Sequence, residues 1–249
     1  MIKFFRKIRQ NLLSEGKTGK YFKYAIGEII LVVIGILIAL SINNWNENRK
    51  EYNALKTLTE NMNNEFQKNL EELETDLTRV KNSITATNTL LSYTGSKNIE
   101  VDNTIIDSLI YYAVSNPTWN PSSYVLNDIK NSGKLSTLKN ENLKLLLYDW
   151  DRLYEDILEW HTGSTNNTNR IVYFVSEKGS LINIDYYNNK NEKSTKFDIE
   201  NIDLLQEIRF ENDLENSLYS LIEIEKRYDK ARVLLNRIIE LSNSNDITK

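Results

Sequence analysis

The feature that most constrains this chain is an unbroken apolar run, residues 29–40, preceded by a cluster of cations. With its apolar flanks the run extends from Tyr24 to Trp45, which is roughly 32 Å at the helical rise of about 1.5 Å per residue. That length matches the hydrocarbon core of a bilayer, which is about 30 Å thick. We therefore interpret residues 24–45 as one transmembrane helix, with Tyr21, Tyr24 and Trp45 as interfacial anchors.

The charge pattern gives this helix a direction. Residues 1–23 contain seven Lys or Arg and one acid, a net charge of +6, whereas the whole chain carries −4, so residues 24–249 carry −10. Because cations beside a span stay on the cytoplasmic side, we expect residues 1–23 in the cytoplasm and residues 46–249 outside it. The alternative to an uncleaved anchor is a cleaved signal peptide, with Ala39-Leu40-Ser41 as a small-residue cleavage pattern.

The leader has an amphipathic pattern of its own. Ile2, Phe5, Ile8 and Leu12 recur at helical spacing, with polar residues on the opposite side. This pattern predicts a short helix that lies on the inner leaflet, where its cations meet anionic headgroups. A segment of this length cannot hold an output domain, which disfavours a transmembrane receptor.

One acidic residue lies inside the predicted span. At about 100° per residue, Glu28 shares a stripe of the helix with Gly35 and Ala39. Small residues let helices approach closely, and polar side chains in a membrane face protein or water. Three interpretations are open: Glu28 reaches headgroups or pairs with Lys20 or Lys23, it lies at a contact between membrane helices, or it carries protons or ions.

The N-terminal fifth of the chain resembles a known family. Residues 1–51, which include the sequences YAIGEI and INNWNE, are similar to the N-terminal signature of uncharacterised membrane proteins widespread in Bacteroidota, catalogued as a domain of unknown function. Residues 123–150 show a weaker similarity. The resemblance implies an inner-membrane protein with a periplasmic helical domain, and it implies no activity.

Beyond the span, apolar residues step by three or four from Tyr52 to Leu91, with no Pro or Gly before Gly95. This predicts one helix of roughly 100 Å from residue 24 to 91. Further helices are predicted at 102–114, 124–131 (with Ser122 or Ser123 as N-cap), 140–174 (with a possible break at Gly163) and 213–242. Residues 181–196 are predicted to be a loop or a short strand pair. The fold class is all-α: a transmembrane helix continuing into a long helix that packs in a helical bundle or coiled coil. The apolar stripe of this long helix beyond the span, from Tyr52 to Leu91, is called its seam. The seam packs either on later helices of the same chain or on other copies.

Residues that could carry catalytic or metal chemistry are few. The chain has no cysteine and one histidine, His161. It therefore lacks the Cys and His ligands of common zinc sites and the cysteine of a Cys–His nucleophile. Helical spacing spreads five neighbouring acids around one helix, which favours a solvated face: Asp149, Asp151, Glu155, Asp156 and Glu159. We therefore predict no catalytic, metal or cofactor-binding residue. The loop containing Pro117, Trp119 and Pro121 is a candidate exposed recognition feature. The alternative is that Trp119 is buried at the end of the bundle.

An acidic body argues against nucleic acid as a partner. The predicted partners are the lipid bilayer, copies of the chain itself, and other inner-membrane or periplasmic proteins. Three functions follow: a non-enzymatic, self-associating membrane protein with a periplasmic interaction domain, an accessory subunit of an inner-membrane complex that could be coupled to the proton-motive force, or a periplasmic enzyme with an unrecognised carboxylate site.

Overall fold

The computed structural model describes residues 6, 10–11, 14, 18–189 and 194–243, whose regular structure is entirely helical. The predicted all-α class is confirmed. The chain divides into two compact units, Met1–Lys56 and Thr57–Lys249, and the helix α2 (Thr18–Tyr93) contributes to both. The four apolar residues of the predicted N-terminal amphipathic helix lie outside the described residues.

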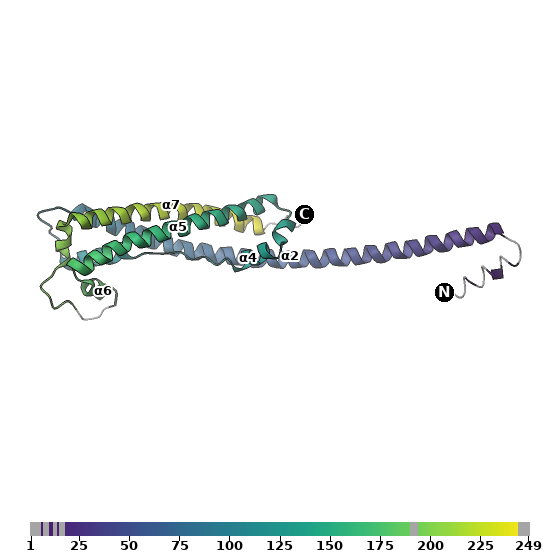
Figure 1. Cartoon of the computed structure of the whole chain (residues 1–249), viewed down its shortest axis with the longest axis horizontal. Helices are drawn as coiled ribbons and strands as arrows, with labels where there is room; N and C mark the ends of the chain where they lie inside the picture. Colours follow the sequence, from purple (N-terminus) through teal and green to yellow (C-terminus); the bar gives the residue numbers. More distant parts are fainter. Residues whose placement is uncertain (1–5, 7–9, 12–13, 15–17, 190–193, 244–249) are drawn as a thin grey trace. The chain divides into compact units, whose positions relative to one another are not determined.

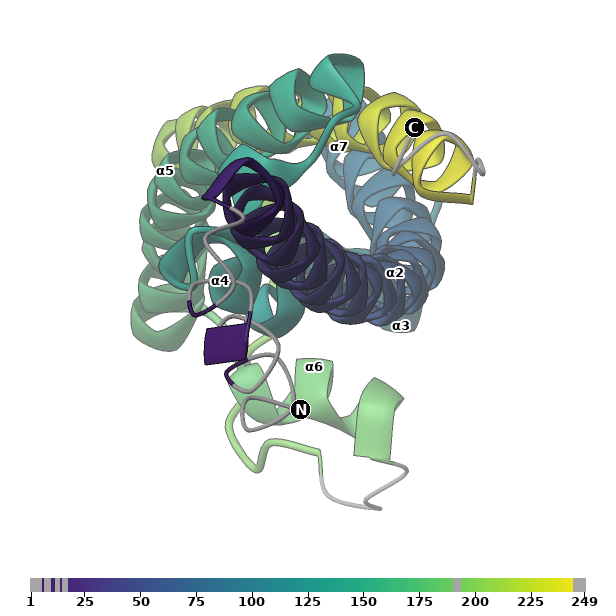
Figure 2. The same cartoon turned by 90° about the vertical axis from the view of Figure 1, so that its right-hand side faces the viewer.

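The second unit is a bundle of three long helices: residues 57–93 of α2, α5 (Glu141–Lys178) and α7 (Ile208–Asn243). Figures 1 and 2 show α5 and α7 alongside this part of α2. The rings of Phe66 and Trp150 meet edge to face with centroids 5.5 Å apart, which joins α2 to α5. Asn63 Nδ2 donates to Ser242 Oγ at 2.6 Å, which joins α2 to α7.

The apolar seam of α2 faces the interior of this bundle. Met62, Phe66, Leu73, Leu77 and Val80 are each at most 2% exposed. Because these side chains pack against later helices of the same chain, the structure decides between the two alternatives for the seam in favour of an intramolecular bundle. Burying such a stripe is what stabilises a long helix, since helical propensity alone is weak.

The boundaries of α5 and α6 differ from the prediction. Asn140 caps α5 by accepting from Leu143 N, and the helix runs unbroken through Gly163 because buried residues on both sides of it pack into the bundle. Residues Leu181–Asn189 form the helix α6, so the loop or strand pair predicted there is wrong for these residues. Ile184, 3% exposed, anchors α6 in the core, which its polar, Asn-rich sequence did not indicate.

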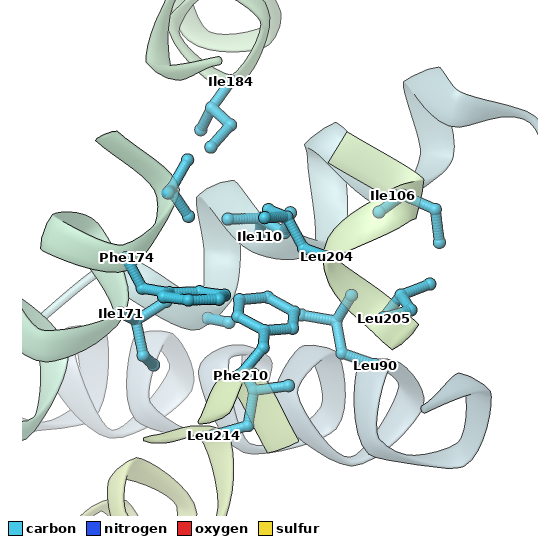
Figure 3. Close-up of a cluster of buried hydrophobic side chains, with 12 residues drawn as sticks. Leu90, Ile106, Ile110, Ile171, Phe174, Ile184, Leu204, Leu205, Phe210 and Leu214 are labelled. Atoms are coloured by element: carbon cyan, nitrogen blue, oxygen red, sulfur yellow. The ribbon is translucent and has the colours of Figure 1, made fainter. Parts of the chain in front are cut away.

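Shorter elements close the end of the bundle opposite Thr57. They are α3 (Asn103–Val114), α6, and the 3-10 helix η2 (Asn201–Gln206). Figure 3 shows the apolar cluster that their side chains form with those of the long helices. In it the rings of Phe174 and Phe210 stack with centroids 6.1 Å apart. The predicted helix at 102–114 is confirmed, with Asp102 as its N-cap accepting from Thr104 N at 2.8 Å.

The helix α4 (Tyr124–Asn131) is followed by the 3-10 helix η1 (Lys134–Thr137), and its start is capped from a distance. Ser123 occupies the N-cap position, but its side chain makes no capping hydrogen bond. Instead, the carboxylate of Glu65 on α2 accepts from the backbone N–H groups of Val125 and Leu126 at 3.1–3.3 Å. The first-turn donors of α4 are therefore satisfied by tertiary contact rather than by the predicted local serine.

Candidate functional site

The first unit presents an uncovered apolar surface on α2. Among the described helices, α2 alone is long and apolar enough to cross a membrane, and none of its apolar stretch is buried within the protein. Each large apolar side chain from Ile29 to Leu40 is between 46% and 64% exposed. Exposed aliphatic surface of this length is unfavourable in water, so it requires an apolar surrounding.

The predicted membrane-contact residues lie on this surface. Gly35 and Ala39 are exposed, and a Cβ added at Gly35 would meet nothing within 4 Å. Glu28 is half-buried and lines a groove of about 320 Å³ together with Ala25 and Val32. The helix thus carries a carboxylate at one end of an open, small-residue stripe.

The predicted interfacial anchors are also on this unit. Trp45 is 63% exposed, and the guanidinium of Arg49 lies 5.2 Å from its ring centroid. Tyr24 is exposed, and Tyr21 meets Phe22 edge to face with ring centroids 5.9 Å apart. An aromatic side chain beside a cation suits a membrane–water interface, where one end is apolar and the other is wet.

The three predicted residues of the candidate recognition loop are buried. Trp119 is 1% exposed, and Pro117 and Pro121 are buried beside it. The Trp119 ring packs edge to face against Trp150 and Tyr228, with centroids 5.6 and 5.7 Å away. The predicted exposure of Trp119 is therefore wrong, because a ring with this much apolar area is far more stable inside the bundle.

Two buried hydrogen bonds through Tyr228 connect this loop to the only histidine of the sequence. Tyr228 Oη accepts from Trp119 N at 2.8 Å and lies 2.8 Å from His161 Nε2. A hydroxyl can donate one hydrogen bond and accept two, so the direction of the Tyr228–His161 hydrogen bond depends on the tautomer of His161. Burial lowers the pKa of His161 to about 4 and raises the pKa of Tyr228. These groups hold the loop in place.

Three of the five acids that cluster in the sequence pair with three different cations. Asp149 pairs with Arg152, Asp151 with Lys130, and Asp156 with Arg227. Within the residues that the structure describes, no group of three or more His, Cys, Asp or Glu side chains is arranged to hold a metal ion.

A second buried polar cluster was not indicated by the sequence. Asn201 is fully buried, donates to Asp107 Oδ1 at 2.6 Å and to Ser180 O at 3.0 Å, and accepts from Ser180 N at 2.7 Å. Desolvation raises the pKa of Asp107. A Cβ at Gly179 would collide with Asn201 Oδ1, so glycine is required there by close packing. The cluster fastens η2 to the α5–α6 connection.

These observations define the chain as a helical bundle preceded by an exposed apolar helix of membrane-spanning length. A family model described as a family of unknown function (DUF6090) matches residues 28–164, more than half of the chain, and the chain belongs to this family. No curated protein and no solved structure matches the chain significantly.

Proposed function

We propose that this chain is a membrane-anchored, non-enzymatic interaction protein. Residues 1–23 lie in the cytoplasm, residues 24–45 span the inner membrane, and residues 46–249 form a periplasmic helical domain. The protein associates with copies of itself and with other inner-membrane or periplasmic proteins. The Bacteroidota-type signature in residues 1–51 supports the inner membrane as its location.

The observation that carries this proposal is the contrast between the two units. The first unit exposes a continuous apolar surface, whereas the second unit buries its own apolar seam. The bundle buries its own apolar seam without using the apolar part of α2. We therefore assign that part of the helix to the lipid bilayer. The cationic leader supports the cytoplasmic N-terminus.

Self-association through the membrane helix is the second part of the proposal. Gly35 and Ala39 lie open on one stripe, which allows close approach of a neighbouring helix. Glu28 on the same stripe would be less costly against a protein partner than against lipid.

Protease accessibility tests the anchoring and its direction. In sealed spheroplasts, protease added outside should digest the body of the protein and spare a tag placed before residue 1. The same tag should become sensitive when the membrane is permeabilised. Loss of the tag in intact spheroplasts would refute the orientation, and release of the intact protein by a carbonate wash would refute the anchor.

A further inference from the structure

The short helix α6 forms a pocket with α3 and α5 near one end of the second unit. The pocket has a volume of about 360 Å³ and is open to solvent on one side. Figure 3 shows the side chain of Ile184, one of its lining residues, directed from α6 toward the apolar cluster. Sites for small molecules in proteins have volumes of about 300–1,000 Å³, so the pocket is large enough for a small ligand.

Most of the lining of this pocket is aliphatic. Its aliphatic residues are Val114, Val172, Val175, Leu181 and Ile184. Val175 and Ile184 are buried, Val114 and Val172 are half-buried, and Leu181 is exposed. An apolar body that leaves water for these side chains gains free energy in proportion to the apolar area it buries.

The polar groups of the lining are mainly hydrogen-bond acceptors. Asp185 is the one charged residue of the lining, and its carboxylate has no hydrogen bond or ion pair within the part of the chain that the structure describes. Ser115 Oγ donates its hydrogen to Tyr111 O at 2.9 Å, so in this arrangement it offers a ligand only lone pairs. The hydroxyl of Tyr111, the third polar residue, can donate or accept. The lining therefore favours a ligand that supplies donors.

The helices around the pocket add no free positive charge to it. Neither α3 nor α6 contains Lys or Arg, and each contains one acid, Asp107 or Asp185. The cations on either side of this stretch of α5, Arg170 and Lys178, already form ion pairs at 2.8 and 3.9 Å with acids near the start of α7. A cationic ligand would thus meet an uncompensated carboxylate, whereas an anionic ligand would be repelled by it.

We propose that this pocket binds a small organic cation with an apolar body and a primary ammonium group. An ammonium group has three donors and no acceptor, which matches the carboxylate of Asp185. The apolar body packs on Val172, Val175 and Ile184. The pocket lies wholly within the second unit, so this site is distinct from the membrane helix and goes beyond the proposed interaction function.

The cysteine-free sequence allows the charge preference to be measured at one position. Val172→Cys places a single thiol in the lining of the full-length protein, held in nanodiscs of a neutral lipid. Its modification rate is measured with two methanethiosulfonates of similar size, one carrying an ethylammonium group and the other an ethylsulfonate group. Tyr173→Cys is the matched control, because Tyr173 is the next residue, is 62% exposed and does not line the pocket.

The ratio of the ammonium rate to the sulfonate rate should be at least about fivefold higher at position 172 than at position 173, which is the effect of one exposed ion pair. Dividing by the ratio at position 173 removes the attraction that the acidic chain exerts on any cation. Asp185→Asn, a nearly isosteric change at an exposed residue, should make the two ratios equal within about twofold. Equal ratios in the parent, or no effect of Asp185→Asn, would overturn the proposal.

Protection by matched small molecules tests the ligand class. Cyclohexylmethylamine, cyclohexylmethanol and cyclohexanecarboxylate share one ring and are a cation, a neutral molecule and an anion at neutral pH. The amine should slow the modification of Val172→Cys by a neutral methanethiosulfonate at concentrations at least about fivefold lower than the alcohol requires. The carboxylate should give no protection, and Tyr173→Cys should be protected by none of the three. Equal protection of Val172→Cys by amine and alcohol, or protection by neither, would refute the site.

A second thiol guards against a local distortion at position 172. Leu181→Cys, at an exposed position of the same lining, should give the same order of rates and of protection. Nanodiscs leave both faces of the bilayer in contact with solvent, so these measurements do not depend on membrane orientation or on self-association. Failure of the ligand site would leave the proposed anchoring standing, and the protease experiment tests that anchoring separately.

Discussion

Among single residues, the buried polar groups are the ones that make this bundle specific. A buried polar atom without a partner is costly, and most of those here are paired across helices. Tyr228 joins α7 to the Trp119 loop and to His161 on α5, and Asn201 joins η2 to α3 and to Ser180. Apolar packing alone would tolerate several arrangements of similar volume, whereas these hydrogen bonds fit one arrangement.

The histidine in this network predicts a pH dependence of stability. The pKa of His161 is lowered to about 4 by burial, from an ordinary value of 6.5. Between these values the unfolded chain binds the proton more strongly, so stability is fully present above about pH 6.5 and falls as the pH drops toward 4. The expected loss is at most about 3 kcal/mol. Denaturant unfolding at a series of pH values measures it.

His161→Gln is the matched comparison for this prediction. Glutamine retains both a donor and an acceptor for the Tyr228 hydroxyl but does not titrate, so the stability of the variant should vary less between pH 7 and pH 4. The difference between the two proteins isolates the histidine from the carboxylates that both contain. Parallel pH profiles for the parent and the variant would contradict the assignment of a neutral, buried His161.

At the scale of elements, α2 presents two different surfaces along one helix. Its first part exposes its aliphatic residues on all sides, whereas residues 59–90 bury a single stripe and leave the remaining faces polar. An all-round apolar helix suits lipid, and a one-sided helix suits a bundle in water. The change in pattern along the sequence therefore separates a stretch that suits lipid from a stretch that suits water.

Gly35→Leu is predicted to weaken association of the membrane helix. A leucine would fill the open space at Gly35 and push a neighbouring helix away. Helix contacts in membranes are worth about 1 kcal/mol, so cross-linking through Ile42→Cys should fall about fivefold. Ile36→Leu, a change of similar size off the stripe, is the control. If Gly35→Leu cross-links as well as the control, the helix is only an anchor and any oligomer is held by the bundles.

At the scale of the whole molecule, the division at residue 57 predicts an independent folding unit. The buried core residues from Met62 to Ile238 all lie in the second unit. A fragment of residues 57–249 should therefore be soluble, melt cooperatively, and have a helix content well above the usual third of residues. Circular dichroism measures the helix content.

Tryptophan emission gives a second readout for this fragment. Trp119 and Trp150 are each 1% exposed, so the folded fragment should have blue-shifted emission that moves to longer wavelength on unfolding. A fragment with a spectrum of exposed tryptophan and no cooperative transition would show that the bundle depends on the first unit.

The helices themselves could be predicted because their signals are local. Apolar residues at steps of three and four mark the buried stripes of α2, α5 and α7, and Asp102 and Asn140 mark helix starts by side-chain caps that the structure contains. Apolar length alone singled out α2 as the helix able to span a membrane. Each of these signals depends on residues within a few turns of one another.

Features that depend on distant residues could not be predicted in the same way. The cap of α4 is Glu65, about 60 residues away in the chain, so the nearby serines were a misleading signal. Trp119 sits in a Pro-rich loop whose local sequence suggests exposure, and only packing against Trp150 and Tyr228 makes it a core residue. The pocket with Asp185 exists only where α3, α5 and α6 meet.

The sequence by itself therefore determined the all-α class and the apolar helix, because both follow from short-range periodicity and from the length of an uninterrupted apolar run. Only the tertiary structure decided that the seam of α2 closes within the chain, that Trp119 is a core residue, and that α3, α5 and α6 form a pocket with one carboxylate. The physical reason is that a stripe in a sequence specifies a face to be buried but not what buries it. That choice depends on how all the helices pack together.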